Sequence, residues 1–361
     1  MESKKIYYMK YETFKRNTAA FKAPDDIYEI CEQQGFHKVS MPEYPLDKGK
    51  LYGKLWLLTV GTRAWMKIGK TVPKGSIVFF QHPQSGKRLV LRFVKKYRNK
   101  GVHYIALIHD LESLRGGMQG IVSENKRTNA IGDNEMLKQF DAVICHNERM
   151  RQYLIGQGFD EQRLVNLQIF DYLSDIDRMQ PDKSERPSIC IAGNLAKVKA
   201  GYISKLFDDE HNKNLVVNLY GTRYEPEIER ENLIYHGAFP PEELATHLEG
   251  DFGLVWDGIE ASTCAGNTGE YLKFNNPHKA SMYLSAGMPV IVWSQAAIAK
   301  FVLDNKVGIA VDNLFSMDDI ISSISKEEYR KLADNARNIS LQLRKGFYTI
   351  SAINEAIDRI K

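Results

Sequence analysis

The chain has 361 residues, 43% of them hydrophobic and 26% charged, which is typical of a folded water-soluble protein and long enough for two domains. Its formal net charge of +4 is too small for a dedicated nucleic-acid-binding protein, so no nucleic-acid partner is expected. No apolar run reaches the roughly 18 residues of a membrane span, the first residues lack the apolar core of a secretory signal, and the four cysteines form no C-x-x-C pair. We therefore expect a cytoplasmic protein with reduced thiols and no zinc site.

The first half of the chain alternates apolar strands with helices, which predicts βαβ units and a parallel sheet. Strands are predicted at 5–10, 37–41, 76–81, 103–109, 141–145 and 164–169. Helices are predicted at 26–34, 51–68 and 87–100, and from Asn147 to Gly156 or Gly158. Loops after the strands of such a sheet face the ligand, so Asn17 and Thr18 are candidates for substrate contact as well as ordinary loop residues.

The predicted helix at 87–100 carries seven basic residues and no acidic one. Its apolar residues Leu89, Phe93, Val94 and Tyr97 form a stripe, and the basic residues lie largely away from it. A basic amphipathic helix of this kind can rest on anionic lipid, which would place the protein at the inner face of the cell membrane. It can equally pack on a sheet with a solvated outer face, and the two interpretations are compatible.

Asp110 directly follows the apolar strand at 103–109, where an open α/β sheet meets its ligand. A carboxylate at this edge suits a general base that removes the proton of an attacking hydroxyl. His109 is the rival, because histidine titrates near neutral pH, and Glu112 is a third candidate. Alternatively, Asp110 caps the next helix or pairs with Arg115 and has no part in the chemistry.

Residues 174–187 are charged, contain two prolines and have no apolar period, which predicts a linker between two domains. Beyond it the α/β pattern restarts, with strands at 188–192, 215–220, 233–236, 252–256 and 290–292. The predicted domains are therefore 1–175 and 187–345. No G-x-G-x-x-G or P-loop sequence stands at a strand end, which argues against a dinucleotide-dependent oxidoreductase or epimerase.

A predicted helix begins after Asn275-Asn276-Pro277, with Asn276 as its N-cap and Pro277 as its first residue. Lys279 then lies in the first turn, where a cation opposes the helix dipole unless an anion is bound nearby. A phosphate at this helix end would reverse the sign of that interaction. The alternative is a solvated lysine whose stem covers apolar surface.

Other candidates stand at the ends of the predicted strands. Gly193 and Asn194 are expected in a tight turn into a helix, where backbone N–H groups can hold a phosphate. Lys199, on that helix, is either a second cation or a surface lysine. Tyr220 ends the next strand and either lines a nucleotide pocket or packs at the edge of the core.

The segment NNPHKASMYLSAGMPVIVW at 275–293 resembles the donor-site helix of two-domain GT-B glycosyltransferases, where the lysine, the tyrosine and the A-G-x-P-V-I sequence recur. More narrowly, it resembles the bacterial group of galactofuranosyltransferases and of the glucosyltransferases that modify serine-rich adhesins. Supporting segments are IHDLESLR at 108–115, IAGNL at 191–195, FGLVWDG at 252–258 and LRKGFYT at 343–349.

The resemblance implies a GT-B fold: two Rossmann-like parallel-sheet domains face each other across a cleft, and a last helix at about 346–361 crosses back to the first domain. It implies that no cofactor is needed beyond a UDP-sugar donor, with galactofuranose as first choice of sugar and glucose as second. The second domain would bind UDP through Gly193, Asn194, Lys199, Tyr220, Asn276, Lys279 and Ser281.

Many retaining relatives carry a glutamate just before the donor helix, where this chain has Asn275, Asn276 and Pro277. The departure favours an inverting reaction, and the absence of a ligand cluster in the sequence favours metal independence. The acceptor would be a glycan, a lipid-linked glycan or a glycoprotein of the bacterial surface. A non-catalytic partner subunit with the same fold is the alternative function, and a homo-oligomer stays open.

Overall fold

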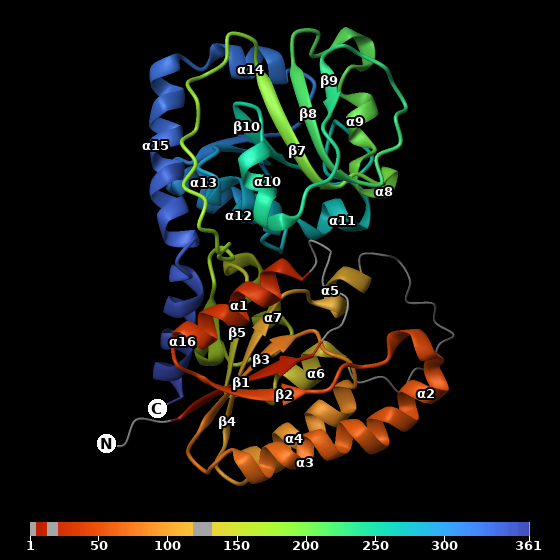
Figure 1. The fold of residues 1–361 in the computed structure, drawn as a ribbon, viewed down its shortest axis with the longest axis vertical. Coiled ribbons are helices and arrows are strands. Elements are labelled where there is room, and N and C mark those ends of the chain that lie inside the picture. The colour runs from red at the N-terminus through yellow and green to blue at the C-terminus, as the bar shows by residue number, and fades with distance from the viewer. Residues whose placement is uncertain (1–4, 13–20, 118–131, 361) are drawn as a thin grey trace. The chain divides into compact units, whose positions relative to one another are not determined.

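The computed structural model describes residues 5–12, 21–117 and 132–360. Asn17 and Thr18 lie outside these residues. The described chain divides into two compact units, each built around one sheet (Figure 1). Of the described residues, unit 1 holds the first strand, those between 24 and 167 and the end of the chain from Thr349, and unit 2 holds residues 21–23 and 168–348.

Unit 1 contains a six-stranded parallel sheet in the order β2-β1-β3-β4-β5-β6, as the alternation of strands and helices predicts. Its strands are β1 (Ile6–Tyr11), β2 (His37–Met41), β3 (Ile77–His82), β4 (His103–Ile108), β5 (Ala142–Cys145) and β6 (Leu164–Asn166). Its helices are α1 (Lys22–Gln33), α2 (Gly49–Trp56), η2 (Leu57–Gly61), α3 (Thr62–Thr71), α4 (Lys87–Arg98), α5 (Glu112–Gly117), α6 (Asp133–Leu137) and α7 (Glu148–Gly156).

Two predicted helix starts in unit 1 had different outcomes. The helix predicted from Asn147 is present as α7, which begins at Glu148, and the side chain of Asn147 caps it by accepting a hydrogen bond from the Met150 N–H at 3.0 Å. The predicted start of α1 at Asp26 is wrong, because the helix begins at Lys22. Pro24 does not prevent this earlier start, since the first N–H groups of a helix have no partner in the helix and a proline there removes nothing.

Unit 2 contains a second six-stranded parallel sheet, in the order β12-β11-β10-β7-β8-β9. Its strands are β7 (Ser188–Asn194), β8 (Val216–Thr222), β9 (Leu233–Tyr235), β10 (Phe252–Val255), β11 (Val290–Trp293) and β12 (Gly308–Val311). Its helices include α8 (Lys197–Ala200), α9 (Tyr202–Lys205), α10 (Pro241–His247), α11 (Gly266–Tyr271), α12 (His278–Ser285), α13 (Ala299–Asp304), α14 (Met317–Ser323) and α15 (Lys326–Leu343). The prediction of two Rossmann-like sheets is confirmed.

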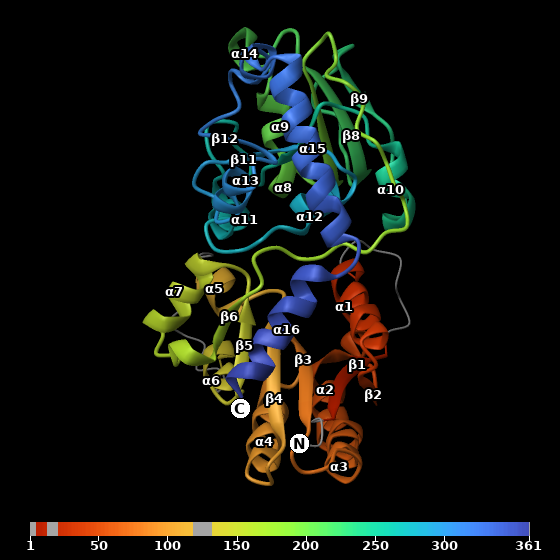
Figure 2. The same cartoon turned by 90° about the vertical axis from the view of Figure 1, so that its left-hand side faces the viewer.

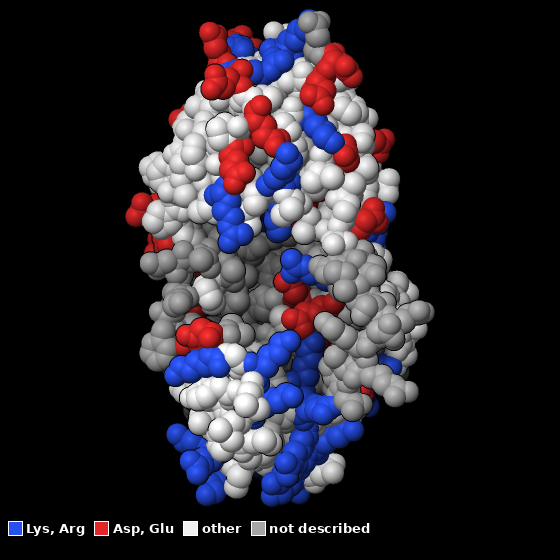
Figure 3. Space-filling model, turned by 90° about the vertical axis from the view of Figure 1, so that its right-hand side faces the viewer, with Lys and Arg blue, Asp and Glu red and all other residues white. Residues whose placement is uncertain are grey.

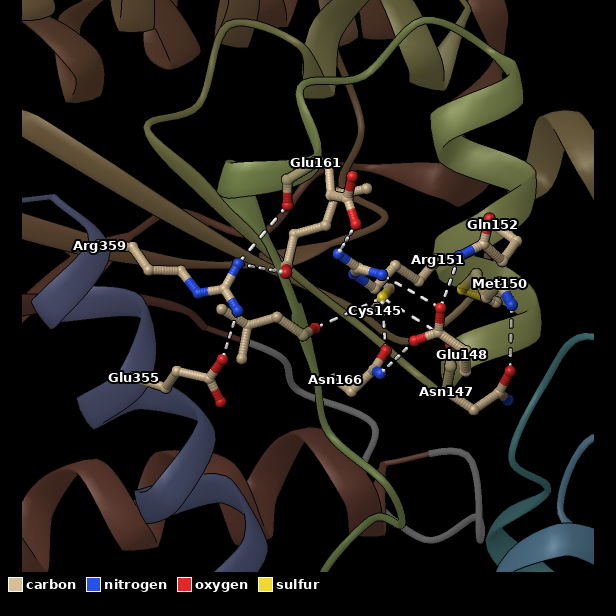
Figure 4. Close-up of polar contacts among 12 residues, drawn as sticks. Cys145, Asn147, Glu148, Met150, Arg151, Gln152, Glu161, Asn166, Glu355 and Arg359 are labelled. Atoms are coloured by element: carbon tan, nitrogen blue, oxygen red, sulfur yellow. Dashed lines mark hydrogen bonds and ion pairs between the residues drawn. The ribbon is translucent and has the colours of Figure 1, made fainter.

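The last helix, α16 (Phe347–Arg359), returns to unit 1, as predicted, and Figures 1 and 2 show it beside the sheet of that unit. Arg359 fixes its end by donating from Nη1 to the carbonyl oxygens of Gln162 at 3.1 Å and Leu164 at 2.8 Å (Figure 4). Its Nη2 donates to Glu355 at 2.5 Å. The end of the chain is therefore attached to the segment that forms β6.

Residues 167–187, between β6 and β7, form no helix or strand, and residues 168–187 belong to unit 2. The domain limits 1–175 and 187–345 stay a prediction, because they concern which segments fold on their own. In the ranges that the structure describes, no helix is both long and apolar enough to cross a membrane.

Candidate functional site

The strand order of unit 2 places its ligand site between β7 and β10. The chain leaves β7 toward β8 on one side and reaches β10 on the other, so the connections after these two strands diverge. In open parallel sheets, ligands bind at the carboxyl ends of the strands where the order reverses in this way. Gly193 lies at the end of β7, and Asp257 follows β10.

Lys279 reaches this point from the first turn of α12. Its Nζ donates to Asp257 Oδ1 at 2.7 Å and to the carbonyl oxygen of Trp256 at 3.1 Å. Lys199 approaches the other oxygen of the same carboxylate at 3.9 Å. The side chains of Lys279 and Asp257 are only 18% and 11% exposed. Two cations thus lie beside one carboxylate at this edge of the sheet.

His278 adds no charge beside Lys279. Burial lowers the pKa of His278 to about 4, and the nearby Lys22 acts in the same direction. The imidazole is therefore neutral at physiological pH. Lys279 and Lys199 supply the positive charge of this edge.

Two facing glycines keep the space beside Lys279 clear. Gly193 and Gly221 are paired in the ladder of β7 and β8, with φ of 127° and 148°. A Cβ on Gly221 would lie 1.8 Å from the Gly193 carbonyl oxygen, and a Cβ on Gly193 would lie 3.7 Å from Lys279 Cε. Gly221 is therefore required for packing, while the bare Gly193 backbone opens toward the lysine.

The turn predicted at Gly193 and Asn194 is wrong, since both residues still belong to β7. Their carbonyls and amides continue the ladder with β8, which lengthens the strand beyond the apolar run seen in the sequence. The Asn194 side chain then accepts a hydrogen bond from the Ala196 N–H at 3.0 Å. The four-residue helix α8, which carries Lys199, starts only at Lys197.

The prediction that Asn276 caps α12 is also wrong, because Pro277 occupies the N-cap position. The Asn276 amide instead donates to the Gln168 carbonyl at 2.8 Å, and the residue is 3% exposed. Ser281, one turn into the helix, is 1% exposed, and its hydroxyl has no hydrogen-bond partner in the described structure. Both side chains lie in the interior, close to Lys279 in sequence.

Tyr220 is not brought together with Lys279. Its ring is 1% exposed and stacks on His236 with centroids 4.6 Å apart. The hydroxyl accepts a hydrogen bond from the Glu249 N–H at 3.1 Å. Glu249 precedes β10, so the hydroxyl points to the turn where that strand begins, away from the edge where β7 and β10 end.

In unit 1, His109 is held in one orientation by Gln81. The Gln81 side-chain nitrogen donates to the Pro24 carbonyl at 3.2 Å, which turns its oxygen toward His109 Nε2 at 2.5 Å. An amide oxygen only accepts hydrogen bonds, so the His109 Nε2 must carry a proton. In a neutral imidazole, Nδ1 is then the basic nitrogen.

Asp110 stands beside Arg115 rather than alone. Its Oδ2 lies 3.3 Å from Arg115 Nη1, and the two side chains are 40% and 39% exposed. The pairing that the sequence offers as an alternative is therefore present. It does not remove Asp110 from contact with solvent or substrate, since both side chains remain accessible.

A buried charge cluster at the end of β3 has no counterpart in the sequence predictions. His82 and Asp133 are both fully buried, and His82 Nε2 lies 3.5 Å from Asp133 Oδ1. Lys87 pairs with Asp133 and with Glu112. Burial alone would raise the pKa of Asp133, but the neighbouring His82 and Lys87 side chains outweigh it and hold the pKa well below its usual range. The cluster joins the starts of α4, α5 and α6.

Sequence reasoning missed Asp257 and the cluster of His82 and Asp133. The signal for Asp257 was available, because it follows the strand at 252–256 as Asp110 follows the strand at 103–109. No such signal existed for Asp133, which directly follows no predicted strand and belongs to no motif. Within the residues the structure covers, no group of three or more His, Cys, Asp or Glu side chains is arranged to hold a metal ion.

Comparisons with known proteins agree with this architecture. The N-terminal domain model of the glucosyltransferase 3-like family matches residues 5–169, and its C-terminal domain model matches residues 189–356. Beta-1,6-galactofuranosyltransferase WbbI of Escherichia coli (strain K12) is 32% identical over 363 residues, which cover 99% of each chain.

Two solved structures share the fold at low sequence identity. The lipopolysaccharide outer core galactosyltransferase WaaB in its apo form has a TM-score of 0.61 at 11% identity, covering 98% of this chain and 99% of its own. HepE of Anabaena, solved in complex with UDP, has a TM-score of 0.56 at 12% identity, with coverage of 98% and 99%.

Two six-stranded parallel sheets in sequence, with a last helix that returns to the first, define a GT-B fold. The chain belongs to the glucosyltransferase 3-like family of glycosyltransferases and is related to the galactofuranosyltransferase WbbI. The resemblance seen in the sequence is thereby confirmed.

Proposed function

We propose that the protein transfers a hexose from a UDP-hexose to a surface glycan, lipid-linked glycan or glycoprotein, with inversion at the anomeric carbon and without a bound metal ion. The observation that carries the proposal is the position of Lys279. It lies at the switch point of the unit 2 sheet, in the first turn of α12, with Lys199 across the same carboxylate.

The donor diphosphate would bind against Lys279 and the free N–H groups at the start of α12. A helix N-terminus and a lysine both favour an anion at this place. Binding requires Lys279 to shift from Asp257 or to bridge Asp257 and a phosphate oxygen, since one ammonium group has three donors. The bare backbone of Gly193 leaves room for the phosphate to approach. The UDP complex of HepE supports a uridine nucleotide as the donor.

The same cations would stabilise the leaving group. As the acceptor oxygen attacks the anomeric carbon, the bond from that carbon to the diphosphate oxygen breaks and negative charge grows on UDP. Preorganised cations and helix N–H groups lower the energy of that charge without any ion having to bind. Lys279 and Lys199 are suited to this role at the end of β7.

Asp110 would take the proton that the acceptor hydroxyl loses. It stands two residues beyond the end of β4, at the edge of the unit 1 sheet where ligands of open α/β sheets bind. His109 is the competing candidate, because its protonated Nε2 faces Gln81 and leaves Nδ1 as the basic nitrogen. Arg115 Nη1 lies 3.3 Å from Asp110 Oδ2 and would orient this carboxylate.

Galactofuranose is our first choice of sugar, because WbbI is named as a beta-1,6-galactofuranosyltransferase and covers the chain almost completely. Glucose is the second choice, from the name of the glucosyltransferase 3-like family.

A screen of UDP-galactofuranose, UDP-galactose and UDP-glucose for UDP release tests the proposal, first without and then with acceptor glycans. The expected result is release of UDP from one of them, with turnover that persists after EDTA treatment and buffer exchange. NMR of the product then reads the anomeric configuration. A product with retained configuration, or activity that only manganese or magnesium restores, contradicts the mechanism, and failure of every UDP-sugar contradicts the donor.

A further inference from the structure

Unit 1 exposes a row of leucines on the continuous helical run α2–η2–α3. Leu51, Leu55 and Leu58 are 83%, 59% and 74% exposed. They follow one another at intervals of four and three residues, the spacing of one face of a helix. We call these three residues the leucine row. Single exposed leucines are common, but a contiguous apolar row marks an interaction site.

The leucine row is fixed outward because the opposite side of the run is already packed on α4. Trp65 stacks on Phe93 with ring centroids 5.7 Å apart, and Tyr97 Oη donates to the Trp65 carbonyl at 2.9 Å. Gly69 leaves room for Tyr97, which a Cβ there would meet at 2.3 Å. The run cannot turn its leucines inward without breaking these contacts.

Strong positive charge surrounds the leucine row. Residues 44–100 contain 14 Lys and Arg and one acidic residue, Asp47, although the whole chain carries only +4. The exposed basic residues of α2, α3 and α4, with Lys48 just before α2, are Lys48, Lys50, Lys54, Arg63, Lys67, Lys70, Arg88, Arg92, Lys95 and Lys96. Figure 3 shows Lys and Arg, in blue, gathered at the bottom of the view, on unit 1.

Helix α4 supplies charge to this surface but no apolar contact. In the stripe that the sequence offers for lipid binding, Phe93, Val94 and Tyr97 are buried and Leu89 is half-buried, so the stripe packs largely inside unit 1. Its basic residues remain exposed. The apolar part of the surface comes instead from the neighbouring helix α2.

We propose that this surface docks on an anionic lipid bilayer, with the leucine row inserted among the headgroups and the surrounding Lys and Arg side chains on lipid phosphates. An apolar row flanked by basic residues is the arrangement of helices that lie in a membrane interface. Anionic lipid attracts each Lys or Arg near its surface. The inference does not depend on the proposed transfer reaction, because docking needs no donor or acceptor.

Charge complementarity selects lipid over other occupants. A second copy of the chain, docked through the same surface about a two-fold axis, would bring Lys and Arg against Lys and Arg. A nucleic acid would satisfy the basic residues but would leave the leucine row in water. A lipid bilayer satisfies both.

Cosedimentation of the full chain with vesicles tests the proposal. We expect binding to vesicles of phosphatidylcholine with phosphatidylglycerol at low salt, weaker binding as salt rises, and none to phosphatidylcholine alone. Leu51→Ser, Leu55→Ser and Leu58→Ser together should weaken binding on the order of 100-fold, since each leucine that enters the bilayer by half contributes about fivefold. Lys50→Glu with Lys54→Glu should weaken it by about fivefold or more for each reversed charge.

Matched controls come from unit 2. Leu303→Ser with Leu341→Ser replaces leucines that are 52% and 44% exposed, and Lys306→Glu reverses an exposed charge. These variants should bind like the wild type. Absence of binding to anionic vesicles at low salt overturns the proposal, as does binding that the triple serine variant retains. A homodimer in sedimentation velocity that the triple variant dissolves would assign the surface to a second copy instead.

Discussion

Replacing Lys279 with alanine should weaken UDP binding by far more than one lost hydrogen bond. The lost charge-assisted bond is worth about 1.5–3 kcal/mol. In addition, Asp257, whose side chain is only 11% exposed, loses its partner at 2.7 Å and then faces the diphosphate. Two unit charges about 5 Å apart repel by about 3 kcal/mol at an effective dielectric constant of about 20. The sum is about 4–6 kcal/mol, or roughly 10³–10⁴-fold in Kd.

A second substitution separates the two contributions. In Lys279→Ala with Asp257→Asn the repulsion is absent, so only the hydrogen bond is lost and UDP should bind about 100-fold more tightly than to Lys279→Ala alone. Isothermal titration calorimetry with UDP measures both variants, and thermal melting shows whether each is folded. Lys273→Ala is the matched control, because Lys273 forms a similar pair with Glu270 at 2.7 Å in the same unit. A double variant that binds no better than the single one would refute the reasoning.

Three further results are expected. Asp110→Asn should lower kcat by about 10²–10⁴-fold with UDP affinity unchanged, as loss of a general base does. If His109→Gln has this effect instead, His109 is the general base. Near-wild-type turnover in both variants would exclude both residues as the general base. Gly221→Ala should destabilise unit 2 by at least about 3 kcal/mol in urea unfolding, because its Cβ would meet the Gly193 carbonyl oxygen at 1.8 Å. Gly237 also has a positive φ, 87°, but a Cβ there would meet no atom within 4 Å. Gly237→Ala should therefore lower the free energy of unfolding by only about 1–2 kcal/mol, the cost of backbone strain. Equal losses of stability in the Gly221 and Gly237 variants would argue against the close contact at Gly221. Because its pKa is lowered, the ionised form of Asp133 stabilises the fold above about pH 4, and this stability is lost as the pH falls. In Asp133→Asn the urea midpoint should therefore fall less between pH 7 and pH 3 than in the wild type. Asp304→Asn, which removes an exposed pair with Lys300, should not have this effect.

The parallel sheets were predictable because buried strands leave a strong signal. Runs such as 103–109 and 252–256 are short and mostly apolar, and each is followed by an aspartate at the ligand edge. The cation at Lys279 was predictable for a similar reason, since its position near the start of a helix is local in sequence. The N-cap of α12 was not, because Asn276 finds its hydrogen-bond partner at Gln168, far away in the chain.

The partners of the site residues could not be predicted for the same reason. Lys279 meets Asp257, and His82 meets Asp133, only after the sheets have formed. Tyr220 illustrates the opposite error, because a tyrosine at a strand end has the same pattern whether it faces a ligand or stacks in the core. Its stacking on His236 depends on the register of β8 and β9, which apolar periodicity does not specify.

The return of α16 to unit 1 has a consequence for synthesis on the ribosome. Ile353 and Ala356, which are buried in the finished protein, are made only after the whole of residues 168–348. At about 5–20 residues per second, that interval is on the order of 10–40 s. During it, the strands of unit 1 have left the ribosome while the apolar surface that α16 will cover is still open. The first half of this enzyme is thus the first to emerge and the last to be finished, and it is the half that a cell's chaperones have most time to meet.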